Sequence, residues 1–326
     1  MTLLHKMSDT SACTAHVEPP SWVAELLGGG VPRPAEAPAG ATLHITDSDE
    51  FRLVSVCLTD AARLRPTEFE HRTADVYRAV ASALQSGSSP HPVRIWNYLP
   101  QIHAPAGDGL DRYMNFNAGR FAAYRDWFGG TSAFERLVPS ASAVGHHGED
   151  LVVHALGSRE RGMAIANPRQ VAPYHYSRRF GPRPPCFARA TALPGDGPRP
   201  GLIFVGGTAS IRGEDSIHPQ SLVRQTQETF DNLAHLIRAA GEGSEGAEDF
   251  SAGERGEWLR CFRDLRVYHM HETDRPVIAR MVQEAFPPAV RAEYVRADLC
   301  RAELLVEIEG LAHGAGIANC KLQIAK

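Results

Sequence analysis

Two glutamates near the end of the chain have the residue type and the spacing that acid catalysis needs. Glu307 and Glu309 lie in the segment Cys300–Gly310, which reads Cys-Arg-Ala-Glu-Leu-Leu-Val-Glu-Ile-Glu-Gly. They alternate with Val306 and Ile308, which predicts a closing β-strand with both carboxylates on one face, because successive side chains point to opposite faces. A carboxyl group that apolar surroundings keep protonated can act as a general acid near neutral pH. The solvent-exposed face of an amphipathic strand would give the same pattern.

A second group of chemically versatile residues lies in the central segment Asn167–Arg189, which is rich in proline, arginine and aromatic residues. Arginine binds anionic groups through its planar fork and stacks on rings, so this composition suggests a segment that packs over an anionic or planar molecule. A proline-stiffened crossover with its arginines in water would explain the composition equally well.

A glycine-rich stretch follows an apolar run in Leu202–Ser216. Because glycine has no side chain, we expect the backbone to approach another group closely at Gly206, Gly207 or Gly213. The stretch is not a phosphate-binding loop, since it lacks the Gly-Lys-Ser/Thr ending, and no dinucleotide fingerprint occurs in the chain.

The histidines give no recognisable metal site. His269 and His271 share one face of a predicted strand, and His146 and His147 lie in a predicted turn, but no third ligand stands at a recognisable spacing. We therefore interpret these histidines as structural and expect no metal. The Gly-x-Ser-x-Gly nucleophile elbow of serine hydrolases is absent from the sequence as well.

The composition excludes several classes of partner. The chain has 326 residues, of which 43% are hydrophobic and 22% charged, and its formal net charge is -4. This length allows two domains with a pocket between them, and the charge gives no electrostatic grip on nucleic acid or on an anionic membrane. No apolar run has the length of a signal peptide or a membrane span, and the six cysteines include no Cys-x-x-Cys pair. We therefore expect reduced thiols and a cytoplasmic protein without nucleic-acid or membrane partners.

Strand and helix patterns fill both halves of the chain. Strands are predicted at residues 42–58 as a hairpin, at 93–100, 142–144, 150–156, from 202 onward, and at 265–271, 292–298 and 303–309. Helices are predicted at residues 67–84, 111–124, 220–239 and 274–286. We expect a loosely held lead-in at 1–40, an N-terminal α/β lobe at 41–165, a Pro/Arg-rich crossover at 166–200, and a C-terminal lobe with the catalytic strand at 201–326. The fold class is therefore α+β with two similar lobes.

Four stretches together resemble one protein family. They are Tyr113–Tyr124, Asn167–Arg189, Gly206–Ser216 and Cys300–Gly310, and over almost the whole chain they resemble the chorismatases. The second half, with Gln225-Thr-Gln-Glu-Thr-Phe-Asp-Asn-Leu and the final Val306-Glu-Ile-Glu-Gly, is also similar to the reactive-intermediate deaminases. The resemblance implies two deaminase-like (YjgF/chorismate-mutase-like) lobes fused in one chain, each a mixed β-sheet covered by helices.

The resemblance also implies an activity. Chorismatases remove the enolpyruvyl group of chorismate as pyruvate without metal or organic cofactor, so the implied partner is this small molecule and no cofactor is expected. One branch releases 3-hydroxybenzoate, in some members with 4-hydroxybenzoate, and another hydrolyses chorismate to a dihydroxycyclohexadiene carboxylate. The aromatic branch carries a glycine at the exit of the glycine-rich strand and a cysteine seven residues before the catalytic glutamate, matched here by Gly213 and Cys300. We therefore expect a 3-hydroxybenzoate synthase.

The family comparison assigns roles to individual residues. It implies that Glu307 protonates the terminal methylene of the enol ether, which generates an oxocarbenium ion. Cys300 and Gly213 would shape the choice between attack by the substrate's ring hydroxyl, through an epoxide-like intermediate, and attack by water; a nucleophilic Cys300 would need a lowered pKa. Because chorismate is a dianion, hydrogen-bond donors must meet its two carboxylates. The predicted donors are Arg120, Arg189 and Arg291, with Arg296 as the alternative to Arg291, and the hydroxyls of Tyr174 and Tyr176.

Three other functions stay open at this point. The first is the hydrolytic chorismatase, and the second is an imine- or enamine-hydrolysing deaminase, which the fused length and the Pro/Arg-rich insert disfavour. The third is a non-catalytic protein that binds an aromatic or chorismate-like metabolite. We expect a monomer, since fused lobes can replace part of the trimer interface of single-lobed relatives.

Overall fold

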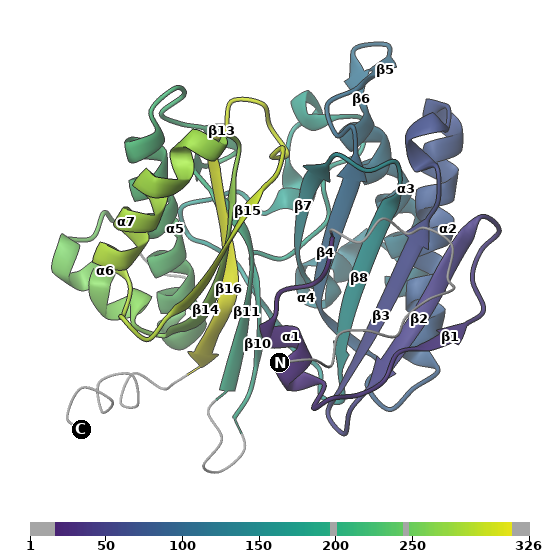
Figure 1. The fold of residues 1–326 in the computed structure, drawn as a ribbon, viewed down its shortest axis with the longest axis horizontal. Helices are drawn as coiled ribbons and strands as arrows, with labels where there is room; N and C mark the ends of the chain where they lie inside the picture. Colours follow the sequence, from purple (N-terminus) through teal and green to yellow (C-terminus); the bar gives the residue numbers. More distant parts are fainter. Residues whose placement is uncertain (1–16, 196–200, 244–247, 315–326) are drawn as a thin grey trace, which may run out of the picture.

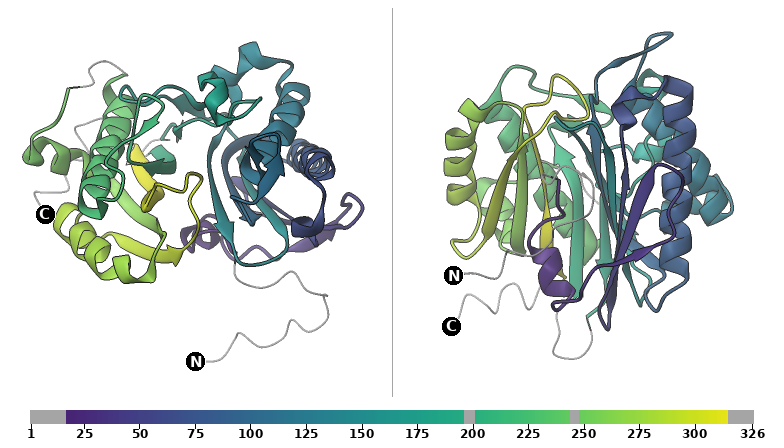
Figure 2. Two further views of the ribbon diagram at one scale, coloured as in Figure 1. Left: turned by 90° about the horizontal axis from the view of Figure 1, so that it is seen from above. Right: turned by 45° about the vertical axis from the view of Figure 1, so that its right-hand side comes forward.

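Two lobes lie side by side, each with a β-sheet at the centre of the molecule and helices on the outside (Figure 1). The structure is a computed structural model that describes residues 17–195, 201–243 and 248–314. Seen from above, the two sheets face each other between the outer helices (Figure 2). The α+β fold with two lobes is therefore as expected.

The first lobe contains a six-stranded mixed sheet in the order β1-β2-β3-β8-β4-β7. Its strands are β1 (Arg33–Ala35), β2 (Ala41–Asp47), β3 (Phe51–Leu58), β8 (Leu151–Ser158), β4 (His91–Pro100) and β7 (Ser140–His146). All neighbours are antiparallel except β4 and β7, which are parallel. The outer face is covered by α2 (Pro66–Gln85), α3 (Arg112–Phe128) and the short α4 (Phe134–Leu137), and a small hairpin joins β5 (Pro105–Gly107) to β6 (Leu110–Asp111).

The second lobe repeats this plan with the order β15-β14-β16-β11-β10-β9. Its strands are β15 (Arg291–Arg296), β14 (Phe262–His269), β16 (Val306–Gly314), β11 (Gly201–Ala209), β10 (Ala190–Leu193) and β9 (Met163–Ile165). The outer helices are α5 (Leu222–Glu242), α6 (Ala252–Leu259) and α7 (Arg275–Ala285), and β12 (Ile211–Arg212) pairs with β13 (Asp215–Ser216). None of the helices in the described ranges is long and apolar enough to cross a membrane.

The inner faces of the two sheets form one shared core. Trp96 and Tyr98 of β4 pack in the same buried cluster as Phe204 of β11 and Tyr268 of β14. The helix α1 (Trp22–Leu26) adds Trp22, whose ring centroid lies 5.6 Å from that of Trp96 and 5.9 Å from that of Phe204. Burial of aromatic surface on this scale holds the lobes together as one body.

Most predicted elements are confirmed. The hairpin at 42–58 is β2 and β3, the strand at 93–100 is β4, and the four long predicted helices are α2, α3, α5 and α7. Asp111 caps α3 by accepting a hydrogen bond from the backbone of Met114, whereas the predicted cap Thr67 lies inside α2, which has Arg65 as its N-cap. The closing strand begins at Val306 and extends to Gly314, three residues later at its start than predicted because residues 301–303 form a turn.

Two details differ from the expectations, whereas the described part of the lead-in is only partly packed. Trp22 is 2% exposed, but residues 31–34 are exposed. The strands β9 and β10 pair in the second sheet, although we expected their residues to close the first lobe and to belong to the crossover. Cys186 and Cys300 are free thiols, as expected, whereas the disulfide partners of Cys57 and Cys261 lie outside the described residues.

Candidate active site

A cavity of about 270 Å³ lies between the lobes and contains Glu307 in its wall. Small-molecule sites are typically of this size or larger, so the cavity suits a compact metabolite. Both lobes and the crossover contribute to it. The lining includes His103, Tyr113, Arg120 and Ser142 from the first lobe, Tyr176, Phe187 and Arg189 from the crossover, and Gly207, Cys300, Arg301 and Glu307 from the second lobe.

Glu307 is positioned by the central strand of the second sheet. β16 lies between β14 and β11, where Glu307 is opposite Tyr268 on one side and Ala209 on the other. The pairing of β11 with β16 shifts register between Val205 and Thr208, and this bulge includes Gly206 and Gly207. A β-carbon built on Gly207 would overlap Oε1 of Glu307, and one built on Gly206 would lie 2.8 Å from the carbonyl oxygen of Ala141. The predicted close approach at these two glycines is therefore confirmed.

The environment of Glu307 favours its protonated form. The side chain is 4% exposed, and burial, followed by the neighbouring negative charge of Glu309, raises its pKa to about 8, while Arg94 and Arg189 act in the opposite direction. Burial penalises the charged form of a carboxyl because the protein interior solvates charge poorly. At neutral pH this carboxyl carries a proton that it can donate into the cavity.

Cys300 lies beside the acid, with its Sγ 4.0 Å from Oε2 of Glu307. Burial, and after it the charge of Glu307, raises the pKa of the thiol to about 12. A thiol is a poor nucleophile unless it ionises, and this thiol is uncharged at neutral pH.

Two buried arginines supply positive charge to the cavity. Arg189 donates from Nη2 to the hydroxyl of Tyr176 at 2.6 Å and to the carbonyl of Val171 at 3.2 Å. Arg120 donates from Nη2 to Oδ1 of Asn117 at 2.8 Å. Both arginines keep a buried Nε without a hydrogen-bond partner among the described residues. Because buried donors are normally satisfied, these unpaired groups fit the binding of an anion.

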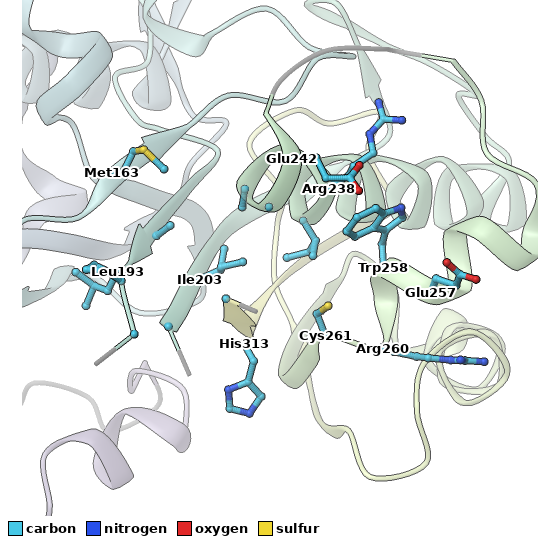
Figure 3. A pocket seen from close by; sticks show the side chains of 18 of the residues that line it. Met163, Leu193, Ile203, Arg238, Glu242, Glu257, Trp258, Arg260, Cys261 and His313 are labelled. Atoms are coloured by element: carbon cyan, nitrogen blue, oxygen red, sulfur yellow. The ribbon is translucent and has the colours of Figure 1, made fainter. Parts of the chain in front are cut away.

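A larger cavity lies elsewhere in the second lobe and has a different character. Its volume is about 940 Å³, and it shares no lining residue with the cavity around Glu307. Figure 3 shows Met163, Leu193 and Ile203 on one side of it and Trp258 and Cys261 on the other. None of the predicted site residues faces it, so its size does not make it the better candidate for catalysis.

The described residues contain no group of three or more His, Cys, Asp or Glu side chains that could hold a metal ion. His269 instead approaches the carbonyl of His271 through Nδ1 at 3.1 Å, and His146 makes a hydrogen bond to the backbone of Asp150 at 2.7 Å.

Comparison with known proteins points in the same direction. The family model described as "Chorismatase FkbO/Hyg5-like, N-terminal" matches residues 31–157. The chain is 34% identical over 256 residues to the 3-hydroxybenzoate synthase of Streptomyces hygroscopicus, a match that covers 77% of this chain and 72% of the relative. The chain belongs to the chorismatase family. A protein of Streptomyces rapamycinicus named chorismatase is 32% identical over 240 residues, which is 73% of this chain and 69% of the relative.

The three-dimensional match extends to a solved chorismatase. A crystal structure of a chorismatase superimposes with a TM-score of 0.70 at 28% sequence identity, covering 86% of this chain and 80% of that chain. With 86% of this chain covered, the likeness extends over both lobes.

The structure brings together five of the eight predicted site residues of this chorismatase. Glu307, Cys300, Arg120, Arg189 and Tyr176 all line the cavity around the acid. Tyr174 lines a neighbouring cavity of about 310 Å³, which shares Arg189 and Phe187 with it.

The other two predicted residues lie outside the cavity. Gly213 has φ +61° in the turn between β12 and β13, and a β-carbon there would meet nothing within 4 Å, so it is needed for the turn and not for space. Arg291 forms ion pairs with Glu25 and, at 2.6 Å, with Asp264. The alternative, Arg296, is bound by Asp298 at 2.8 Å and does not line the cavity either.

Several lining residues were not predicted from the sequence. Tyr113 and Ser142 come from α3 and β7, and Arg301 follows Cys300 directly, while His103 presents a buried Nε2 without a partner among the described residues. Arg301 was within the Cys300–Gly310 segment, and its charge next to Cys300 was the available signal. Ser142 and His103 carried no signal, because their place depends on how the lobes pack.

Proposed function

We propose that this chorismatase converts chorismate to 3-hydroxybenzoate and pyruvate, with Glu307 as the general acid. The observation that carries the proposal is the buried Glu307 in the cavity wall, with its pKa raised to about 8 and two buried arginines beside it. A dianionic substrate with an acid-labile enol ether needs this combination of donors and a protonated carboxyl. The relative named 3-hydroxybenzoate synthase supports the same product.

The proposed reaction starts with transfer of the Glu307 proton to the terminal methylene carbon of the enolpyruvyl group. The electron pair of the double bond forms the new C–H bond, and the resulting oxocarbenium ion weakens the bond between the ring carbon and the ether oxygen. Attack by the neighbouring ring hydroxyl then releases pyruvate and gives an epoxide-like intermediate, which aromatises and returns a proton. The two products together have the composition of chorismate, so this route consumes no water.

Arg120 and Arg189 are proposed to bind the substrate carboxylates, and Tyr176 is proposed to orient Arg189 through its hydroxyl. Cys300 is proposed to form part of the wall that keeps water from the oxocarbenium ion. The buried thiol suits this role because it is small and uncharged at neutral pH. Gly213 and Arg291 are not included in the proposed site.

The deciding experiment is incubation of the purified protein with chorismate, followed by liquid chromatography with mass detection. We expect 3-hydroxybenzoate, with any 4-hydroxybenzoate quantified beside it, and pyruvate in an amount equal to the sum of the two aromatic products. Pyruvate together with the non-aromatic dihydroxy acid would instead assign the hydrolytic branch. Tight binding of chorismate without turnover would overturn the enzymatic proposal.

A further inference from the structure

A second buried carboxylate lies two residues from Glu307 on the same face of β16. Glu309 is 1% exposed and does not line the cavity, so it has no direct route to the substrate. Its Oε2 accepts a hydrogen bond from Nη2 of Arg94 at 2.6 Å, and its Oε1 accepts one from Nε1 of Trp96 at 2.8 Å. Both donors belong to β4 of the other lobe.

The Arg94 guanidinium connects this carboxylate to the wall of the cavity. The same Nη2 donates to Oγ of Ser142 at 2.9 Å, and Nη1 donates to the carbonyl of Ile95 at 2.8 Å. Ser142 lines the cavity, and its Cβ would lie 3.2 Å from a β-carbon built on Gly207, the residue under Glu307. The ion pair and the acid are therefore parts of one packed unit that spans the two lobes.

Both carboxyl oxygens of Glu309 act as hydrogen-bond acceptors. Each of its carboxyl oxygens accepts a hydrogen bond from a nitrogen donor, and one of these donors is a fully buried cation. Charge-assisted pairing of this kind is satisfied by the ionised carboxylate, and it leaves no oxygen that must hold a proton. Glu309 is thus paired with a cation across the interface, whereas Glu307 has no cation in hydrogen-bond contact among the described residues.

We propose that the Arg94–Glu309 pair is a positioning element for Glu307, which ties β16 to the other lobe and fixes a negative charge beside the acid so that the acid faces the cavity with its proton. This inference rests on the proposed function, in which Glu307 is the general acid. Arg94 and Glu309 touch neither the cavity nor the reacting atoms.

The charged groups around Glu307 come from several elements. Glu309 on its own strand disfavours ionisation of Glu307, whereas Arg94 from β4 and Arg189 from the crossover favour it. Cys300, from the turn before β16, and Tyr113, from α3, are buried with raised pKa values and are uncharged at neutral pH. Glu309 is thus the negative charge that opposes the two arginines.

The test is a direct titration of Glu307 in the complete protein without substrate. Protein labelled with carboxyl-¹³C glutamate is followed by NMR across pH, and the Glu307 resonance is assigned as the one missing from Glu307→Gln. The wild-type midpoint is expected near 8. In Glu309→Gln it should fall by about one to two pH units, the size that Coulomb's law gives for two charges separated by two strand residues in a protein interior. An unmoved midpoint would overturn the inference.

A matched control separates this effect from loss of any ion pair. Glu293 on β15 pairs with Arg266 at 2.7 Å in the same sheet and does not line the cavity. Glu293→Gln should leave the Glu307 midpoint in place. If the midpoint moved equally in this variant, the specific role of Glu309 would be excluded.

A double variant keeps the test decisive if Glu309→Gln alone does not fold, because it does not leave Arg94 as an unpaired buried cation. In Arg94→Gln/Glu309→Gln both charges are lost, and the midpoint should fall by less than in the single variant, since the effects of the two charges have opposite signs. A midpoint that stays at or above the wild-type value would contradict the inference. If the ion pair only held the two lobes together, its loss would lower thermal stability without moving the titration midpoint of Glu307.

The two hypotheses fail separately. If wild-type protein does not convert chorismate, the proposed function is wrong, while the titration still decides whether Glu309 acts on Glu307. The other outcome is that wild-type protein converts chorismate while Glu309→Gln changes neither the titration midpoint of Glu307 nor the pH above which kcat falls. In that case only the positioning role is wrong.

Discussion

The carboxyl group of Glu307 lies against the α-carbon of Gly207, in the space that the side chain of any other residue would occupy. The glycine lies in the bulge of β11, where the absence of a side chain leaves space for the Glu307 carboxyl. Gly207 therefore determines where the carboxyl group of Glu307 lies in the cavity wall.

Gly207→Ala tests this relationship. The added methyl group would displace the carboxyl, and because misplacement of a catalytic group by about 1 Å can cost on the order of 100-fold, kcat should fall by about that factor. Steady-state kinetics with chorismate measures the change. Gly256→Ala, in α6 where a β-carbon meets nothing within 4 Å, is the matched control and should retain wild-type kcat.

The pH dependence of catalysis should follow the protonated form of Glu307. The pKa of this carboxyl is raised from its ordinary value of 4.5 to about 8, so the acid is protonated at pH 6 and loses its proton as the pH rises through 8. We expect kcat to fall on the alkaline side with a midpoint near 8. A rate that increases across this interval would show that Glu307 acts as a base.

Glu307→Gln should reduce kcat by at least about 100-fold, because general acid catalysis contributes this much or more, with a smaller effect on chorismate binding. It should also change stability with a defined sign. A carboxyl whose pKa is raised on folding contributes stability that is present below pH 4.5 and is lost as the pH rises through 8. The melting temperature of the glutamine variant relative to wild type should therefore increase between pH 6 and pH 9. Wild-type turnover in this variant would refute the assigned role.

Arg189→Lys should weaken substrate binding. Lysine retains the charge but loses the planar fork, so KM should rise by about 10-fold or more while kcat changes less. Tyr176→Phe is the graded comparison, because it removes only the hydroxyl that accepts from Nη2 of Arg189 at 2.6 Å and should raise KM less. Equal KM values in wild type and the lysine variant would remove Arg189 from the binding site.

Cys300→Ala should change the product ratio. Removing the sulfur beside Glu307 opens space for water near the reacting carbon, so we expect a larger fraction of the dihydroxy acid among the products. The measurement is the same chromatographic separation. Cys186→Ala is the control, since Cys186 is also a buried free thiol with a pKa raised to about 12 and does not line the cavity. An unchanged ratio in Cys300→Ala would leave this cysteine with a packing role.

Local patterns predicted the elements better than the contacts between them. The alternation around Glu307 predicted a strand and a shared face for both glutamates, and both features are present in β16. The polar face of that strand is buried and not solvent-exposed, which the alternation could not show. Glu309 is buried because Arg94 and Trp96 reach it from the other lobe, and such pairing depends on how two sheets pack.

Two of the sequence-based site predictions failed to place residues in the cavity for identifiable reasons. Arg291 pairs in register with Asp264, which lies opposite Leu311, four residues along β16 from Glu307. Because of this offset along the sheet, the guanidinium of Arg291 pairs with Asp264 and does not line the cavity. Glycine spacing alone could not distinguish Gly207, which makes room for a side chain, from Gly213, which permits a turn with positive φ.

The pairing of Arg94 with Glu309 has a consequence for synthesis on the ribosome. The two residues are 215 positions apart in the sequence, and β16 is the last strand of the described chain. The first lobe can form its own sheet and helices early. Its inner face then exposes the unpaired Arg94 and aromatic side chains such as Tyr98 until β16 has been synthesised. Nascent chains should therefore expose this face for most of translation, and chaperone occupancy should drop only when β16 has emerged.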